Sequence, residues 1–224
     1  MLKYLFLIIT LFVFEISFGQ DQININFAEI KSKIEDSNST SYYPKLLERF
    51  ESFDVTLSLE ENALIYYGFS FQKNYLKNKP SEEQLELLSN NQEYEKLKIE
   101  CEKILEKNPV SLAANNKMGL ALYKLGKPES EWKKYQKRYR DFRKVIVYSG
   151  DGLSCDSAFK VIYVSDEYNI IYDYFEISKL DKQSLSGLCD HFTNESSKFY
   201  KAKEIYFDAS RSMIRNQEII STKK

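Results

Sequence analysis

Apolar side chains recur every three or four positions through much of the first two thirds of the chain. Leu46, Leu47, Phe50 and Phe53 follow Pro44 with this spacing. The period places the four side chains on one face of an α-helix, and proline is favoured in a first helical turn. We therefore predict a helix that begins near Pro44 and turns these residues toward a core.

The same spacing predicts helices before and after this one. Capping boxes, in which a polar residue is followed three positions later by glutamate, open two of them at Asn26 and Ser58. Between residues 91 and 148 the apolar faces of three more helices are Tyr94, Leu97, Cys101, Ile104 and Leu105; Leu112, Met118, Ala121, Leu122 and Leu125; and Trp132, Tyr135, Tyr139, Phe142 and Ile146. Asn108-Pro109, Gly126 and Pro128 separate these three helices.

The pattern changes at Gly150-Asp151-Gly152, a turn signal after which β-forming residues dominate. Strands are predicted over residues 159–164, 172–177, 185–192 and 204–208, and residues 165–167 are either a turn or a helix cap. Because the strands follow the helices as a block, we expect an α+β fold: N-terminal helical hairpins and then a small antiparallel β-sheet.

The first nineteen residues have the order of a cleavable secretory signal peptide. Lys3 precedes an apolar run from Leu5 to Phe14, and the small residues Ser17 and Gly19 occupy positions −3 and −1 of a cleavage site. The run is too short for a membrane anchor, and no later run reaches spanning length. We thus expect a signal peptide (1–19), a helical region (20–149), a β region packed on it (150–215) and a flexible tail (216–224), in a protein that is periplasmic or secreted.

Charge and motifs exclude several functions. The formal net charge is −1, whereas nucleic-acid binding calls for a basic face. The sequence contains no G-x-G-x-x-G or Walker loop, no H-E-x-x-H and no C-x-x-C, so we expect no nucleotide, cofactor or metal. His191 is the one histidine, and with no G-x-S-x-G motif it is a weak basis for hydrolysis. A hydrolase built on His191, or on a carboxylate pair, is the alternative to a binding protein.

Three cysteines, Cys101, Cys155 and Cys189, allow one disulfide after export. All three pairings are open. Cys101 lies on an apolar helical face, where a small buried thiol is ordinary. Cys155 with Cys189 is therefore the pairing to test.

Two features favour recognition of a partner. The first is an aromatic and cationic group formed by Tyr42, Tyr43, Arg49, Tyr66 and Tyr67, in which one tyrosine of each adjacent pair is expected to be exposed. The alternative is that these tyrosines only cement helix packing. The second is a basic run, suited to an acidic partner or to simple solvation of a helix, formed by Lys133, Lys134, Lys137, Arg138, Arg140, Arg143 and Lys144.

Residues 91–148 resemble tetratricopeptide repeats, which pair antiparallel helices. Pro109 matches the closing proline of a unit, and Met118, Gly119, Leu122 and Gly126 match the register of the next unit. Glu131 and Cys101 depart from the pattern. The resemblance implies hairpin packing and, more weakly, binding of a protein or peptide.

Nearly all of the chain beyond the signal peptide resembles an uncharacterised bacterial family, domain-of-unknown-function family 4919. The resemblance rests on residues 41–50, 54–59, 66–68, 150–152, 158–168, 189–190 and 206–208. It implies an exported protein and no assigned activity. We expect a non-catalytic binding protein of the cell envelope, whose partner is a protein, a peptide or an envelope component; a purely structural envelope domain is a further alternative.

Overall fold

The computed structural model describes residues 22–73, 75–78 and 82–221; the predicted signal peptide lies outside the described residues. The helical elements are α1 (Phe27–Glu35), α2 (Tyr43–Glu51), α3 (Leu59–Phe69), η1 (Leu76–Asn78), α4 (Glu82–Asn90), α5 (Tyr94–Lys107), α6 (Leu112–Lys124), α7 (Glu129–Val147), α8 (Val164–Tyr168), η2 (Asn169–Tyr174) and α9 (Ser210–Ser221). The strands are β1 (Phe159–Lys160), β2 (Leu180–Ser186), β3 (Cys189–Asn194) and β4 (Glu204–Asp208). The expected α+β fold, with helices followed by a small sheet, is confirmed.

Local sequence signals set the helix ends. Pro44 lies in the first turn of α2, and Ser58 and Glu61 form a complete capping box at the start of α3. Gly126, with a positive φ of 68°, ends α6. These are the positions at which the sequence predicted boundaries.

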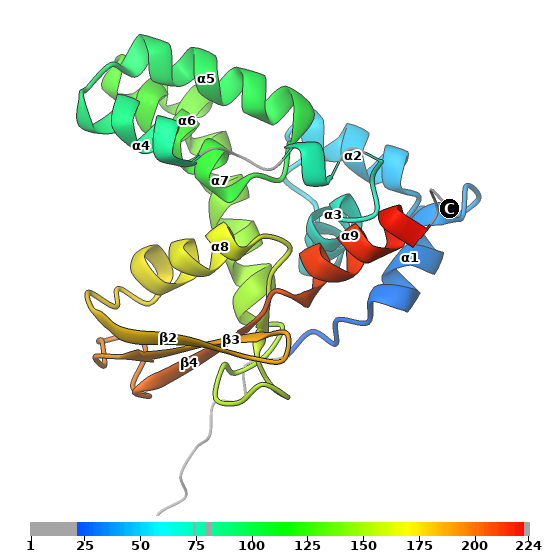
Figure 1. Cartoon of the computed structure of the whole chain (residues 1–224). Coiled ribbons are helices and arrows are strands. Elements are labelled where there is room, and N and C mark those ends of the chain that lie inside the picture. Colours follow the sequence, from blue (N-terminus) through cyan, green and yellow to red (C-terminus); the bar gives the residue numbers. More distant parts are fainter. Residues whose placement is uncertain (1–21, 74, 79–81, 222–224) are drawn as a thin grey trace, which may run out of the picture.

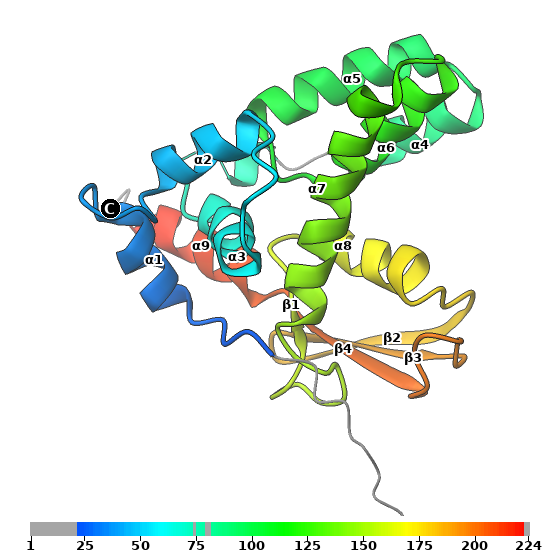
Figure 2. The same ribbon diagram turned by 180° about the vertical axis from the view of Figure 1, so that it is seen from behind.

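Helices α4 to α7 form an arm with its own small core (Figure 1). The buried residues of this core include Leu85, Leu97, Cys101, Ala114 and Met118. The long helix α7 continues from the arm to the sheet and joins the two ends of the molecule (Figure 2).

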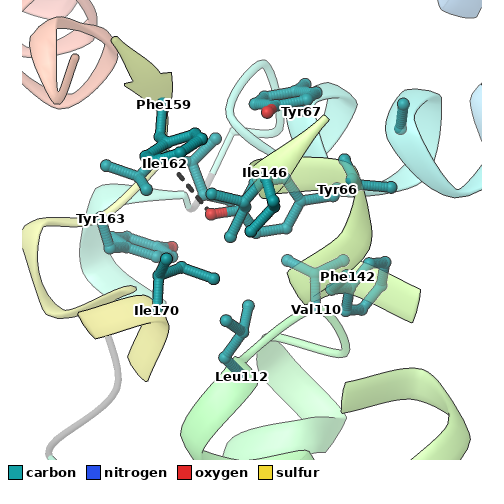
Figure 3. Packing of buried hydrophobic residues seen from close by; sticks show 14 of the residues in the cluster. Tyr66, Tyr67, Val110, Leu112, Phe142, Ile146, Phe159, Ile162, Tyr163 and Ile170 are labelled. Atoms are coloured by element: carbon teal, nitrogen blue, oxygen red, sulfur yellow. Dashed lines mark hydrogen bonds between the residues drawn. The ribbon is translucent and has the colours of Figure 1, made fainter. Parts of the chain in front are cut away.

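The main core lies where α3, α7 and the segment after β1 meet. Tyr66 and Tyr67 of α3 pack beside Phe142 and Ile146 of α7, and the backbone N–H of Ile162 donates to the Tyr66 hydroxyl at 3.2 Å (Figure 3). The predicted helical spacing of α7 therefore points its apolar face into this core.

The sheet has the order β1-β4-β3-β2 and is mixed rather than wholly antiparallel. Strands β2, β3 and β4 pair antiparallel, as predicted. Strand β1 pairs parallel with β4, in a register that places Phe159 beside Phe207. The chain leaves β1 through α8 and η2, makes the β2–β3 hairpin and returns as β4 in the direction of β1. This crossover is what a block of antiparallel hairpins does not contain.

Several predicted strands differ from the structure. Residues 159–164 form only a two-residue strand before α8 begins, residues 172–177 fall in the π-helix η2 and the turn after it, and residues 185–192 span the β2–β3 turn at Gly187. Residues 165–167 are helical. The stretch 161–177 is rich in β-forming residues because it is buried: Ile162, Ile170 and Ile171 are fully inaccessible. High apolar content there reflects burial and not strand geometry.

Cys155 and Cys189 are joined by a disulfide that ties the loop after α7 to β3, whereas Cys101 is a buried free thiol. Helix α9 reaches Ser221, into the segment expected to be a flexible tail, and residues 222–224 lie outside the described residues. Arg211 of α9 donates to the Ser70 hydroxyl at 2.8 Å and covers the Phe71 ring. Within the described ranges, no helix combines the length and apolar character needed to cross a membrane.

Candidate functional site

The tyrosines predicted to form a binding surface lie mostly in the core. Tyr43, Tyr66 and Tyr67 are all buried, so neither member of the second tyrosine pair is exposed. Their hydroxyl groups donate to Ile65 O at 3.2 Å, to Asp166 Oδ2 at 2.7 Å and to Lys160 O at 3.0 Å, respectively. Tyr43 thereby joins α2 to α3, Tyr67 joins α3 to β1, and Tyr66 joins α3 to α8. The expectation of one exposed tyrosine in each pair is wrong for Tyr66 and Tyr67, whereas Tyr43 is the buried member of its pair.

Arg49 and Tyr42 remain nearer the surface, but Arg49 is committed to its neighbours. Its Nε donates to Asp54 at 2.8 Å and its guanidinium also pairs with Glu61. Hydrogen bonds to Asp54 and then to Glu61 raise the pKa of Arg49. Arg49 thereby fixes the connection between α2 and α3 rather than offering a free cation.

That connection forms one wall of a groove of about 420 Å³, and α7 forms the other. Figure 2 shows the connection running beside α7. We call it the cationic groove. It is lined by Phe50, Phe53, Asp54, Val55, Leu57, Asn62, Lys133, Lys134, Gln136, Lys137, Arg138, Arg140 and Asp141. Five cations of the predicted basic run therefore face one hollow, together with an apolar floor. Asp54 is held ionised here: hydrogen bonds from Thr56, and then from Arg49, lower its pKa to about 2.

Phe53 occupies an unusual backbone position at the edge of the groove. Helix α2 ends at Glu51, earlier than the apolar spacing predicted, and Phe53 has a φ of 59°. The N–H groups of Phe53 and Asp54 donate to the carbonyl oxygens of Phe50 and Arg49, both at 3.0 Å. This is a Schellman helix end, in which the left-handed position is normally glycine. The chain therefore accepts a strained aromatic residue where glycine would be easier.

Two cations lie against the Phe53 ring. The Lys134 ammonium is 4.2 Å and the Arg138 guanidinium carbon 3.6 Å from the ring centre, and Arg138 also covers Phe50 at 4.1 Å. Arg138 is only 9% exposed, and burial lowers its pKa to about 10, so it stays protonated at neutral pH. It donates to the Phe50 carbonyl oxygen, while its buried Nε has no hydrogen-bond partner in the structure.

Most cations of the groove form ion pairs with carboxylates, but the two that lie against the Phe53 ring do not. Lys133 pairs with Glu129, and Lys137 and Arg140 share Asp141. Lys134 and Arg138 form no ion pair with any carboxylate in the part of the chain that the structure describes. The groove thus presents two cations without an ion pair over apolar rings, an arrangement suited to an anionic group attached to an apolar body.

The predicted hydrolytic base, His191, does not lie in this groove. It is in register with Ser184 of β2 and Tyr206 of β4. Its Nδ1 is 3.2 Å from the Ser184 hydroxyl oxygen, and its ring stacks on Tyr206 at 4.3 Å. Because Phe192, Ile205 and Phe207 point into the core, strand alternation puts His191 on the opposite face of the sheet. The contact is therefore a cross-strand pair on that face of the sheet.

A pair of acidic residues on α8 is the other chemical feature. Asp166 and Glu167 are almost completely inaccessible, and burial raises the pKa of Asp166 to about 8 and that of Glu167 to about 9. The neighbouring Asp190 adds to the rise in the pKa of Glu167, through its charge and through a hydrogen bond between the two side chains. Carboxylates that cleave a sugar must flank an open site, whereas these are closed off. No group of three or more His, Cys, Asp or Glu side chains within the described ranges is arranged to hold a metal ion.

The sequence indicated the cationic wall of the groove but missed the opposite wall. Phe53 was assigned to a helix face, and Val55 and Leu57 gave no pattern. One signal was available: α6 ends in glycine, but no glycine follows α2. An aromatic residue at the position where a helix end usually carries glycine indicates that its side chain makes contacts elsewhere in the fold.

A family model described as "Domain of unknown function (DUF4919)" matches residues 28–218. Searches of curated proteins and of solved structures found no match.

Proposed function

The chain belongs to the DUF4919 family, and from this fold and this groove we propose that it is an exported, non-catalytic protein that binds an acidic segment of another protein. The cationic groove is the binding site. The expected classes of partner were a protein, a peptide or an envelope component, and the lining of the groove favours a polypeptide.

The observation that carries the proposal is the pair of cations on the Phe53 ring, Lys134 and Arg138, which form no ion pair within the described residues. An acidic side chain placed there gains charge-assisted hydrogen bonds, including one to the unpartnered Nε of Arg138. The methylene groups of glutamate would cover Phe53 and Val55, of which Val55 is 72% exposed. A mixture of charge and apolar surface is what a peptide, rather than a bare anion, can match.

Export is supported by the predicted signal peptide and by the disulfide between Cys155 and Cys189. Disulfides persist in oxidising compartments and are rare in the cytosol. The proposed location is the periplasm or the exterior of the cell.

The packing of the arm of α4 to α7 supports the resemblance of residues 91–148 to tetratricopeptide repeats. This arm includes α7, one wall of the cationic groove. A Cβ atom at Gly119 of α6 would lie 2.9 Å from Gln136 Cγ of α7, so glycine permits the close approach of these helices. We assign the arm the role of holding α7 rigid, with its cations aligned toward the connection between α2 and α3.

The test uses the full mature chain and a fluorescein-labelled hexaglutamate peptide, with binding measured by fluorescence anisotropy. Lys134→Glu should weaken binding at least about tenfold, because an attraction becomes a repulsion next to Arg138. Raising the salt concentration from about 50 to 300 mM should weaken wild-type binding as well, since part of the groove is exposed.

Lys124→Glu is the matched control, because Lys124 is an exposed lysine at the end of α6 that does not line the groove. Equal affinity of the Lys134→Glu and Lys124→Glu variants for the peptide would refute the site. Tighter binding of a heparin tetrasaccharide than of the peptide, with the same dependence on Lys134, would replace the polypeptide by an anionic glycan.

A further inference from the structure

The surface beyond the cationic groove carries the opposite charge. A second hollow, of about 290 Å³, shares Phe53 and Arg138 with the groove, so the two hollows lie on either side of these residues. We call it the acidic hollow. It is lined by Glu51, Phe53, Glu102, Leu105, Glu106, Pro109, Met118, Tyr135 and Arg138. A third hollow, of about 270 Å³, shares Glu51, Glu106 and Pro109 with it and extends the depression between α2 and the end of α5.

Some carboxylates of the acidic hollow form no ion pair within the described residues, as is also true of two cations of the groove. Glu102 pairs with Lys98, but Glu51 and Glu106 form no ion pair within the described ranges. Both are exposed. Burial lowers the pKa of the Arg138 guanidinium, and the charge of Glu51 acts on Arg138 in the opposite direction. Lys73 and Lys107 line the third hollow. The depression therefore presents Lys134 and Arg138, then the Phe53 ring, then Glu51 and Glu106.

The order of charges selects among partners. A nucleic acid, an anionic glycan or an anionic membrane presents negative charge throughout, and the free carboxylates of the acidic hollow would repel it. A polypeptide can reverse its charge within a few residues. It can also pass over a narrow ridge between two hollows in an extended conformation, with about 3.3 Å of length for each residue.

On the basis of the function proposed for the cationic groove, we propose that the groove and the acidic hollow together hold one extended polypeptide segment in which acidic residues are followed or preceded by basic residues. The acidic block contacts Lys134 and Arg138, and the basic block contacts Glu51 and Glu106. The residue between the blocks crosses Phe53, whose left-handed backbone holds its ring on the ridge between the hollows.

The test compares two fluorescein-labelled peptides on the full mature chain by anisotropy. The block peptide has three glutamates, a Gly-Ala spacer and three lysines; in the half-neutral peptide, glutamines replace the lysines. The double variant Glu51→Gln with Glu106→Gln should weaken binding of the block peptide about five- to tenfold, because two attractive charges are lost. It should leave the half-neutral peptide within about twofold of wild type.

Glu48→Gln with Glu95→Gln is the matched control, since both are exposed glutamates of α2 and α5 that line neither hollow. This control should bind both peptides as the wild type does. Thermal unfolding of each variant checks that the fold is retained.

The outcomes separate the two proposals. If Lys134→Glu weakens both peptides but the Glu51/Glu106 double variant binds the block peptide as tightly as wild type, the acidic hollow is not a subsite and the groove proposal stands. If Lys134→Glu changes neither affinity, both proposals are overturned.

Discussion

At the scale of single residues, the helix ends differ in what their left-handed position carries. Gly126 ends α6, whereas Gln92 follows α4 with a φ of 57° and Phe53 follows α2 with a φ of 59°. At Gln92 the N–H groups of residues 92 and 93 donate to Ser89 O and Leu88 O, the same pattern as at Phe53. A left-handed residue with a Cβ costs roughly 1–2 kcal/mol. At Phe53 the strained backbone accompanies a ring that contacts two cations, whereas the exposed Gln92 makes no such contact.

Gln92→Gly should therefore stabilise the protein. We expect the free energy of unfolding to rise by about 0.5–1 kcal/mol, since relief of strain exceeds the added entropy of glycine in the unfolded chain. Urea denaturation followed by circular dichroism measures this. Gln92→Ala keeps the Cβ and should bring no gain; equal stability of the glycine and alanine variants would show that the position is not strained.

At the scale of elements, the helices were predicted well because their signals are local. Pro44, the Ser58–Glu61 capping box and Gly126 each act within one turn of the helix that they bound. The stretch 161–177 was misassigned because its composition reports burial, and burial is decided by α3 and α7, which lie outside the stretch. The groove was half predicted for the same reason: its cations lie on one helix, whereas Phe53 meets them only in the folded chain.

Helix α8 carries a second consequence of burial, because it takes Asp166 and Glu167 into the core. The ordinary pKa of Glu167 is 4.5, and in the fold it is about 9. Between these values the unfolded chain releases the proton and the folded chain keeps it. The contribution of Glu167 to the free energy of unfolding is therefore fully present below pH 4.5. It is lost as the pH rises toward 9, at up to about 1.4 kcal/mol per pH unit.

Glu167→Gln should remove the part of the pH dependence that Glu167 contributes, since a neutral amide of similar shape replaces the acid. Asp166, whose pKa is raised to about 8, still contributes its own part. The variant should match the wild type near pH 5 and exceed its free energy of unfolding at pH 8, as measured by urea denaturation across the range. The exposed Glu95→Gln variant supplies the reference curve and should parallel the wild type. A wild-type stability that stays constant from pH 5 to pH 8 would contradict the buried protonated acid.

At the scale of the whole molecule, the disulfide and the predicted signal peptide both favour the export that we propose. Chain recovered from the envelope or medium should begin at Gln20, as intact mass measures. Under denaturing conditions an alkylating reagent should add one group, at Cys101, and three groups after reduction. Cytoplasmic chain blocked in export should accept three groups without reduction. Recovery of full-length chain that begins at Met1 and accepts three groups without reduction in every fraction would exclude export.

The contact between Arg211 and Ser70 also bears on when this molecule can become compact. The two residues are separated by 141 positions, and Arg211 comes only thirteen residues before the end of the 224-residue sequence. Its guanidinium also covers the rings of Phe27 in α1 and of Phe71, which follows α3, so helix α9 covers both places. A chain delivered from its N-terminus must wait for nearly its whole length before this region closes. Contacts this distant in sequence slow folding, and such a delay would suit the export that we propose, in which a polypeptide is threaded through a narrow channel before it acquires its shape.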